Sequence, residues 1–259
     1  MVTGAGRRRS IGTAICRALA EKGADIFFTH WGAYDSSMPS DKDGSGALLE
    51  ELRGVGVRVE AMELDLSLPE TPERVLDAVT ELLGPPSILV NNAAHSERDG
   101  YEKLNAAILD AHYAVNVRAV VLLSVGFARR YTGGSGRIVN LTSGQSLGPM
   151  LGELAYAATK GAVEAFTVTL AAEVADKGIT VNAVNPGPTD TGWMTEEVKK
   201  ELAAKFPMGR VGTPEDAARL VRSWRATKQP GSPAKLSIPR AGSSVLEHRA
   251  MLRRRRCPS

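Results

Sequence analysis

Residues 3–12 read Thr-Gly-Ala-Gly-Arg-Arg-Arg-Ser-Ile-Gly, and they lead directly into a helical pattern that begins at Thr13. Glycines let a backbone approach a pyrophosphate closely, and the N-terminus of the following helix supplies free N–H groups and a favourable dipole. A purely structural turn would contain the same glycines. The order strand, turn and helix favours a dinucleotide-binding loop. Its candidate phosphate-binding residues are Gly4, Arg8, Arg9, Ser10, Ile11 and Gly12.

Short runs rich in β-branched residues alternate with longer helical patterns along the chain. The strand candidates are 24–29, 57–64, 87–91, 137–141 and 179–184. The helical segments are 10–22, 48–54, 73–83, 103–130, 154–177 and 215–224. This alternation predicts βαβ units and one doubly wound, parallel α/β sheet, the Rossmann fold, in a single domain. Ligands of such a sheet bind beyond the carboxyl ends of its strands.

The first strand is predicted to be short, because the glycine-rich turn starts at Thr3 and leaves at most three residues before it. A wrongly assigned start codon or a truncated chain would explain this. Residues 31–46 are rich in Gly, Ser, Pro and Asp, which predicts a long loop. That loop is expected near the adenosine end of the cofactor.

The composition is that of an ordinary globular protein, with 43% hydrophobic and 24% charged residues. We find no apolar run of the roughly 20 residues that a membrane span needs, and no signal-peptide pattern, so we expect a cytoplasmic protein. The net charge of +3 is unevenly distributed: the segment from residue 223 carries +8, and the preceding part carries −5. The folded body is therefore not expected to bind nucleic acid. Neither the two cysteines nor the four histidines have metal-ligand spacing.

Tyr156 and Lys160 are four residues apart, which places them on one face of the predicted helix 154–177. A neighbouring cation is expected to lower the pKa of the phenol, so that it can exchange a proton with a substrate oxygen. A surface tyrosine beside a solvated lysine is the alternative. Ser143 lies thirteen residues before Tyr156, just beyond the strand 137–141. Parallel sheets present functional groups at that end, which favours a catalytic set.

Together with Asn116, these residues resemble the Asn, Ser, Tyr and Lys set of the short-chain dehydrogenase/reductase family. The resemblance implies hydride transfer between a nicotinamide cofactor and a small carbonyl or secondary alcohol substrate. Tyr156 would supply or remove the proton of the substrate oxygen, and Ser143 would hydrogen-bond that oxygen. Lys160 would also hold the cofactor ribose, and Asn116 would support a proton-relay water. Reduction of 3-oxoacyl thioesters, as in 3-oxoacyl-carrier-protein reductases, is one activity that the resemblance implies.

Three further motifs extend the resemblance over about residues 2–221, although each alone could be plain turn chemistry. Asn92 and Ala93 belong to a segment similar to the family's Asn-Asn-Ala-Gly turn. Asp65 and Leu66 match the pair that contacts adenine. The loop 186–191 matches the one that fixes the nicotinamide carboxamide. Its candidate contacts are Pro186, Gly187, Thr189 and Thr191.

The phosphate loop is two residues longer than the usual family loop and is similar to that of the enoyl reductases. Enoyl reductases separate their Tyr and Lys more widely, so the spacing of four in this chain favours a carbonyl-reducing member. Substrate identity depends on the loops 144–152 and 190–200, which follow no general code.

An acidic residue at the end of the second strand selects cofactors with a free 2′-hydroxyl. Here that position falls at Thr29-His30-Trp31, which has no carboxylate. Arginines at positions 7–9 suit contact with a 2′-phosphate. The sequence therefore favours NADP(H), with NAD(H) as the alternative.

From residue 223 the chain departs from the family, whose members continue into a final strand ending near Glu-Gly-Gly. The proline-rich sequence here predicts that this strand is missing, and that 223–259 is a poorly ordered basic tail after a catalytic domain at 1–222. A shifted reading frame would explain it, because 226–243 can be encoded so that the neighbouring frame reads DEAAWVTGQAFHSEGGF. An exposed sheet edge would disfavour the homo-oligomer that the resemblance implies. Two other hypotheses stay open: a catalytically impaired dinucleotide-binding protein, and a basic-tailed nucleic-acid binder.

Overall fold

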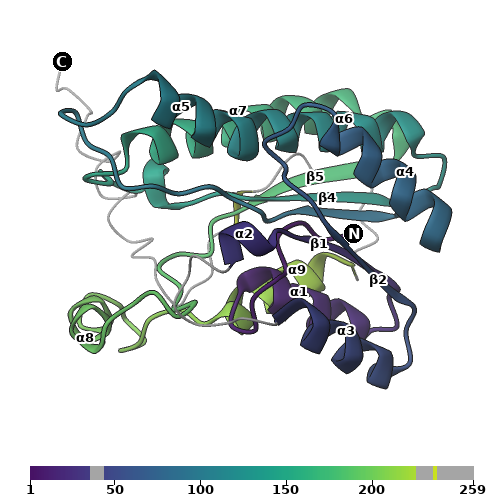
Figure 1. The fold of residues 1–259 in the computed structure, drawn as a ribbon, viewed down its shortest axis with the longest axis horizontal. Helices are drawn as coiled ribbons and strands as arrows, with labels where there is room; N and C mark the ends of the chain where they lie inside the picture. The colour runs from purple at the N-terminus through teal and green to yellow at the C-terminus, as the bar shows by residue number, and fades with distance from the viewer. Residues whose placement is uncertain (36–43, 226–235, 238–259) are drawn as a thin grey trace, which may run out of the picture.

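A parallel sheet runs through the centre of the fold, and helices cover both of its faces (Figure 1). The computed structural model describes residues 1–35, 44–225 and 236–237. One half of the sheet pairs β1 (Ile26–His30) with β2 (Val59–Glu63). The other half runs in the order β3 (Ile88–Asn91), β4 (Gly136–Leu141), β5 (Ile179–Val184) and β6 (Leu236–Ser237). The doubly wound parallel fold predicted from the alternating pattern is confirmed.

Residues at the start of the chain join the two halves of the sheet. Val2 forms parallel bridges with Phe28 in β1 and with Val90 in β3. Its amide donates to the carbonyl oxygen of Phe27 at 2.8 Å, and its carbonyl oxygen accepts from the amide of Thr29 at 3.0 Å. Val2 therefore occupies the centre of the sheet, as a bridge rather than a full strand.

Two layers of helices bury the sheet. On one face lie α1 (Ile11–Ala20), α3 (Gly44–Val55) and α9 (Pro214–Arg225). On the other face lie α4 (Thr71–Leu83), α6 (Val120–Arg130) and α7 (Leu154–Glu173). Each layer has its own apolar core against the sheet. Burial on both faces explains why every residue of β4 except Arg137 is buried.

The predicted helix 103–130 consists of three parts: α5 (Ala106–Tyr113), the π-helical η1 (Ala114–Ala119) and α6. By length and composition alone this stretch could cross a membrane, although we expected no such run from the sequence. Leu123 and Phe127 of α6 are buried in the core between the sheet and the helix layer. Packing within the fold therefore accounts for the apolar character of this helix.

Two loop predictions were wrong. The expected loop 31–46 contains the short helix α2 (Gly32–Asp35) and the start of α3, while 36–43 lie outside the described residues. The expected substrate loop 190–200 contains the start of α8 (Glu196–Ala203), where Thr195 caps the helix by accepting from the amide of Val198. None of the residues of α8 is buried, and a helix of eight residues with two large apolar side chains, Val198 and Leu202, offers only a short pattern.

The last strand, expected to be missing, is present as the two residues of β6. Leu236 and Ser237 pair with Ala183 and Val184 of β5, so this edge of β5 is partly covered. The prediction of a poorly ordered tail falls largely on 226–235 and 238–259, which lie outside the described residues.

Candidate active site

The glycine-rich loop is tightly packed against the turn that follows β3. Gly4 has a φ of +72°, and a Cβ atom there would lie 2.7 Å from the Cα atom of Ala93. A Cβ atom on Gly12 would lie 2.5 Å from the carbonyl oxygen of Gly4. The side-chain amide of Asn92 donates to the carbonyl oxygens of Thr3 and Gly4 at 2.9 and 2.8 Å. Gly4, Gly12, Asn92 and Ala93 are thus brought together.

Helix α1 starts directly from this loop. Ser10 caps it by accepting a hydrogen bond from the amide of Thr13 at 3.1 Å. The hydroxyl of Thr13 donates to the carbonyl oxygen of Arg7 at 2.7 Å, which closes the loop on itself. The amides of Ile11 and Gly12, in the first turn, have no acceptor within the helix. These amides and the helix dipole form an arrangement that binds phosphate groups.

The three loop arginines have different surroundings. Arg9 forms an ion pair with Asp190 of the loop 186–191, with 3.1 Å between the guanidinium and the carboxylate. Arg7 lies 3.8 Å from the carboxylate of Asp35. Arg8 is exposed.

Residues 29–31 carry no carboxylate, as the sequence states, but Asp35 of α2 brings one to this end of the site. Its carboxyl group lies so close to Gly6 that a Cβ atom there would be 1.9 Å from it. Burial raises the pKa of Asp35, and the charge of Arg7 opposes the rise. The same short helix brings Tyr34 close enough to contribute to the electrostatics of Tyr156.

Asp65 and Leu66 follow β2 and adopt a hydrogen-bonded turn. The carboxylate of Asp65 accepts from the amide of Ser67 at 2.7 Å, and its carbonyl oxygen accepts from the hydroxyl of Thr71 at 2.8 Å. Leu66 is buried in the core. This turn lies at the carboxyl edge of the sheet, where adenine contact was predicted.

Helix α7 carries Tyr156 and Lys160, and a remote aspartate caps it. The carboxylate of Asp99 accepts from the amides of Leu154 and Ala155 at 2.7 and 2.8 Å. Asp99 precedes the helix by more than fifty residues, so a search for a local capping residue could not find it.

Lys160 is buried, and its ammonium donates to the carbonyl oxygen of Leu141 at the end of β4, at 2.8 Å. The ammonium lies 5.4 Å from the centroid of the Tyr156 ring. Burial lowers the pKa of Lys160 to about 8. The lysine therefore stays mostly charged at neutral pH.

The pKa of Tyr156 is raised rather than lowered, contrary to our expectation. Burial of the phenol is the main cause and brings its pKa to about 12, with a contribution from Glu153. A hydrogen bond with Ser143 opposes the rise. Because Lys160 is bound to Leu141, the neighbouring cation does not outweigh the loss of solvation. The phenol is therefore protonated at neutral pH.

Asn116 lies in the π-helical segment η1, where such turns often mark functional sites. Its side chain is fully buried and holds the backbone of His95, accepting from the amide at 2.8 Å and donating to the carbonyl oxygen at 2.9 Å. It also donates to the hydroxyl of Thr159, the neighbour of Lys160, at 3.1 Å. Asn116 thus fixes the segment after β3 against α7.

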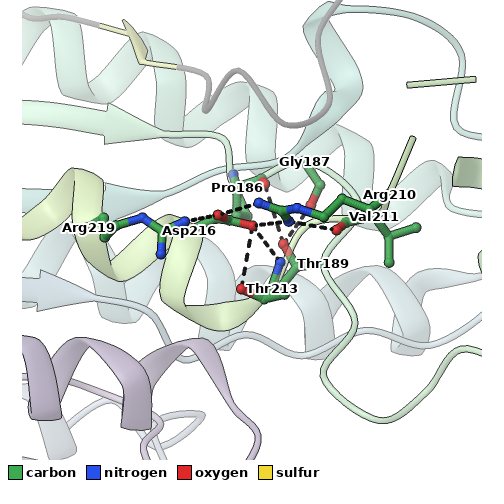
Figure 2. Close-up of polar contacts among 8 residues, drawn as sticks. All are labelled: Pro186, Gly187, Thr189, Arg210, Val211, Thr213, Asp216 and Arg219. Atoms are coloured by element: carbon green, nitrogen blue, oxygen red, sulfur yellow. Dashed lines mark hydrogen bonds and ion pairs between the residues drawn. The ribbon is translucent and has the colours of Figure 1, made fainter. Parts of the chain in front are cut away.

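The loop 186–191 follows β5. Its start is held by Asn185, whose side chain accepts from the amide of Gly187 at 2.8 Å. Pro186, Gly187 and Thr189 converge with residues 210–219 (Figure 2). Thr191 is partly buried beyond them.

The buried side-chain N and O atoms that lack a hydrogen-bond partner in the described part of the chain gather at one edge of the sheet. They follow the ends of β3, β4 and β5. They are Asn91 Oδ1, His95 Nε2, Thr142 Oγ1, both amide atoms of Gln145, and Asn185 Nδ2. Buried polar atoms are normally satisfied, so this cluster fits the place of a polar ligand. Together with the glycine cradle, these residues fit a dinucleotide.

Comparison with known proteins agrees with this geometry. The family model described as "Enoyl-(Acyl carrier protein) reductase" matches residues 4–223. An uncharacterized oxidoreductase, YjdA of Bacillus subtilis, is 54% identical over 224 residues, which is 85% of this chain and 86% of the relative. The 3-oxoacyl-[acyl-carrier-protein] reductase FabG of Pseudomonas aeruginosa is 34% identical over 85% of this chain and 87% of the relative.

A solved structure of known fold is also similar to this chain. A short chain dehydrogenase from Burkholderia cenocepacia in complex with NADP superposes with a TM-score of 0.81, at 30% identity, covering 93% of this chain and 95% of the other. The chain belongs to the short-chain dehydrogenase/reductase family and is an NAD(P)-dependent oxidoreductase similar to the 3-oxoacyl-carrier-protein reductases.

Proposed function

We propose that this protein is an NADP(H)-dependent carbonyl reductase in which Tyr156 is the general acid. The observation that carries the proposal is the protonated phenol of Tyr156, hydrogen-bonded to Ser143, with the buried ammonium of Lys160 behind its ring. A phenol that keeps its proton at neutral pH can deliver it to an oxygen that gains negative charge.

The residues at the carboxyl edge of the sheet fit NADP(H). The amides of Ile11 and Gly12, together with Gly4, would receive the pyrophosphate, and the arginines at 7–9 would be close to a 2′-phosphate. Asp65 and Leu66 would contact the adenine, and Asn92 and Ala93 would border the neighbouring ribose. Pro186, Gly187, Thr189 and Thr191 would hold the nicotinamide. NADPH, when bound, supplies the hydride.

The chain's own residues handle the substrate oxygen. Ser143 would donate a hydrogen bond that orients this oxygen toward Tyr156, and Tyr156 would transfer its proton to it. The charge of Lys160 would stabilise the phenolate that remains, and its ammonium would also hold the cofactor ribose. Asn116 would keep the relay beside Lys160 in place by fixing His95 and Thr159.

We infer reduction of a carbonyl rather than of an enoyl group, because Tyr156 and Lys160 share one face of α7 at the spacing of the carbonyl-reducing members. Large apolar side chains on the loops near the site favour a substrate with an apolar portion. Leu147 and Leu151 lie on the loop after Ser143, and Trp193 donates to the carbonyl oxygen of Thr189; all three are more than half exposed. A 3-oxoacyl thioester is a substrate of this kind.

The test is to follow NADPH oxidation with a panel of ketones, aldehydes, 3-oxoacyl thioesters and enoyl thioesters, with binding of NADPH measured separately. We expect turnover of at least one carbonyl class and none of the enoyl thioesters. Enoyl turnover without carbonyl turnover would reverse the assignment. NADPH binding without turnover of any compound would instead select the catalytically impaired alternative.

A further inference from the structure

Gly212 lies directly against the loop 186–191, which it follows by about twenty residues. Its amide donates to the carbonyl oxygen of Pro188 at 3.0 Å, and its carbonyl oxygen accepts from the amide of Asp190 at 3.0 Å. These two bonds enclose Thr189 and form an isolated parallel bridge. A Cβ atom on Gly212 would lie 3.1 Å from the carbonyl oxygen of Pro188 and 3.3 Å from the hydroxyl of Thr189. The contact therefore depends on close backbone approach.

A single carboxylate organises the segment that carries Gly212 (Figure 2). Asp216, in the first turn of α9, accepts two hydrogen bonds from the guanidinium of Arg210, at 2.7 and 3.0 Å. It also accepts from the amide of Thr213 at 2.8 Å and pairs with Arg219. Arg210 in turn donates to the carbonyl oxygen of Val211 at 3.0 Å.

This arrangement exceeds what a helix cap requires. The bond from the amide of Thr213 to Asp216 is the one that the acidic residue of a capping box supplies. Arg210 adds a two-pronged contact from the other side of Gly212, so residues 210–213 are held at both ends. Asp216 is only 8% exposed, and Arg210 is the main cause that lowers its pKa to about 2. The carboxylate therefore stays charged wherever the protein is folded.

Helix α9 also contacts the phosphate end of the site. Ala218 and Val221 of α9 share a buried cluster with Ile15 and Leu19 of α1, the helix that begins at the glycine-rich loop. The packed helices α1 and α9 thus position both the loop 186–191 and the glycine-rich phosphate loop. The distance between the two ends of a bound dinucleotide would be set by this pair.

We propose that Asp216 and Arg210 are positioning residues that, through Gly212, fix the loop 186–191 and so set how tightly and on which face the nicotinamide end of the cofactor is held. This inference rests on the proposed function. Neither Asp216 nor Arg210 is among the residues proposed above to contact the cofactor or the substrate. Both act through the backbone of the loop 186–191.

The first experiment needs no cofactor. In Asp216→Asn, we expect hydrogen exchange at the amides of Gly212 and Asp190 to be about tenfold faster or more, because the carboxylate that holds the turn is lost. Exchange at the amide of Val181 in β5 should stay unchanged. Glu215→Gln is the matched control, since Glu215 is exposed, adjacent on the same helix and carries the same charge. Unchanged exchange at both amides would overturn the proposal.

The second experiment measures the NADPH dissociation constant by fluorescence titration and the face of hydride transfer with stereospecifically deuterated NADPH. We expect Asp216→Asn to weaken binding about tenfold and to lose part of the facial selectivity. Gly212→Ala should reproduce both effects, because its Cβ displaces the loop while the Asp216 contacts remain. If Asp216→Asn does not fold, Gly212→Ala alone tests whether the contact at Gly212 positions the loop 186–191.

The outcomes separate this inference from the proposed function. If the wild-type protein binds NADPH but reduces no carbonyl, only the proposed function is contradicted. The positioning role can still be tested, because hydrogen exchange and NADPH affinity can still be compared between the wild type and the variants. Normal NADPH affinity in both folded variants, despite fast exchange at Gly212, would overturn the positioning role. A wild-type protein that does not bind NADPH contradicts both.

Discussion

The ammonium of Lys160 donates a 2.8 Å hydrogen bond to the carbonyl oxygen of Leu141, at the end of the strand that leads to Ser143. The lysine is thereby anchored to the sheet, while Tyr156 is one helical turn away on α7. Burial shifts their pKa values in opposite directions, to about 8 for Lys160 and about 12 for Tyr156. At neutral pH the site therefore holds a neutral phenol and a cationic lysine.

This pair of pKa values predicts the pH profile of the reaction. Tyr156 keeps its proton across the accessible range, so carbonyl reduction should be nearly constant from about pH 6 to 7.5. Lys160 loses its charge as pH rises through about 8, and the reduction rate should fall there. Alcohol oxidation, which needs the phenolate, should instead rise with pH. Initial rates in both directions test this, and reduction that increases above pH 8 would contradict it.

Replacing Tyr156 and Lys160 should have separable effects. In Tyr156→Phe, turnover should be lost while NADPH binding stays within a few-fold, because the phenolic proton acts mainly in the transition state. In Lys160→Met, both turnover and NADPH binding should weaken. Single-turnover kinetics and fluorescence titration distinguish the two. Activity of Tyr156→Phe within tenfold of the parent would remove Tyr156 from the catalytic role.

NADPH should bind more tightly than NADH. A charge-assisted contact with a phosphate contributes about 1.5–3 kcal/mol before screening by salt. Neutralising the arginines at 7–9 should shrink the difference, whereas Asp35→Asn should enlarge it by removing the carboxylate beside Arg7. Arg53→Gln, on an exposed part of α3, is the control. Equal dissociation constants for the two cofactors at low salt would refute the preference.

Asp99→Ala should destabilise the protein through the helix that carries Tyr156. Loss of a cap costs about 0.5–2 kcal/mol, which corresponds to a decrease in Tm of about 1–8 °C for a chain of this size. The exposed Asp110 provides a control, since Asp110→Ala should leave the Tm within about 1 °C. A Tm for Asp99→Ala equal to that of the control would show that the cap is dispensable.

The tail can be tested at the level of the gene. The match to the family model ends at residue 223, where the sequence pattern departs from the family. We expect a chain with the alternative frame restored from residue 226 to form a soluble oligomer with higher turnover, because a full strand would then cover the edge of β5. Gel filtration and NADPH oxidation compare the two chains. Codons that cannot spell the family ending in the neighbouring frame would end the hypothesis.

The elements that the sequence predicted well are those with a strong local pattern. Strand 179–184 and the start of α7 at Leu154 agree with the structure because apolar periodicity and burial coincide there. Helix α8 was missed because it is short and none of its residues is buried. The short β6 was missed because two residues are too few to show a pattern.

At the site, sequence spacing was sufficient to select Ser143, Tyr156 and Lys160, because strand ends and one helix face bring them together. The predicted direction of the shift in the pKa of Tyr156 was wrong, because burial raises this pKa and burial depends on the whole fold rather than on the motif. Asp99 and Asp216 were not selected, because each acts through contacts formed in three dimensions. Asp35 was overlooked because it lies beyond the strand end where an acid was sought.

The double bridge of Val2 has a consequence for how the chain folds during synthesis. The segment around Val2 lies in the middle of the sheet, and one of its two neighbours, Val90, is synthesised much later. This segment can pair with Phe28 early, but its other side stays unpaired until β3 has been synthesised. Closing such a long loop costs entropy and slows folding. Until β3 has been synthesised, the nascent chain therefore exposes an unpaired edge in the middle of its sheet. This edge is where a chaperone would be needed most.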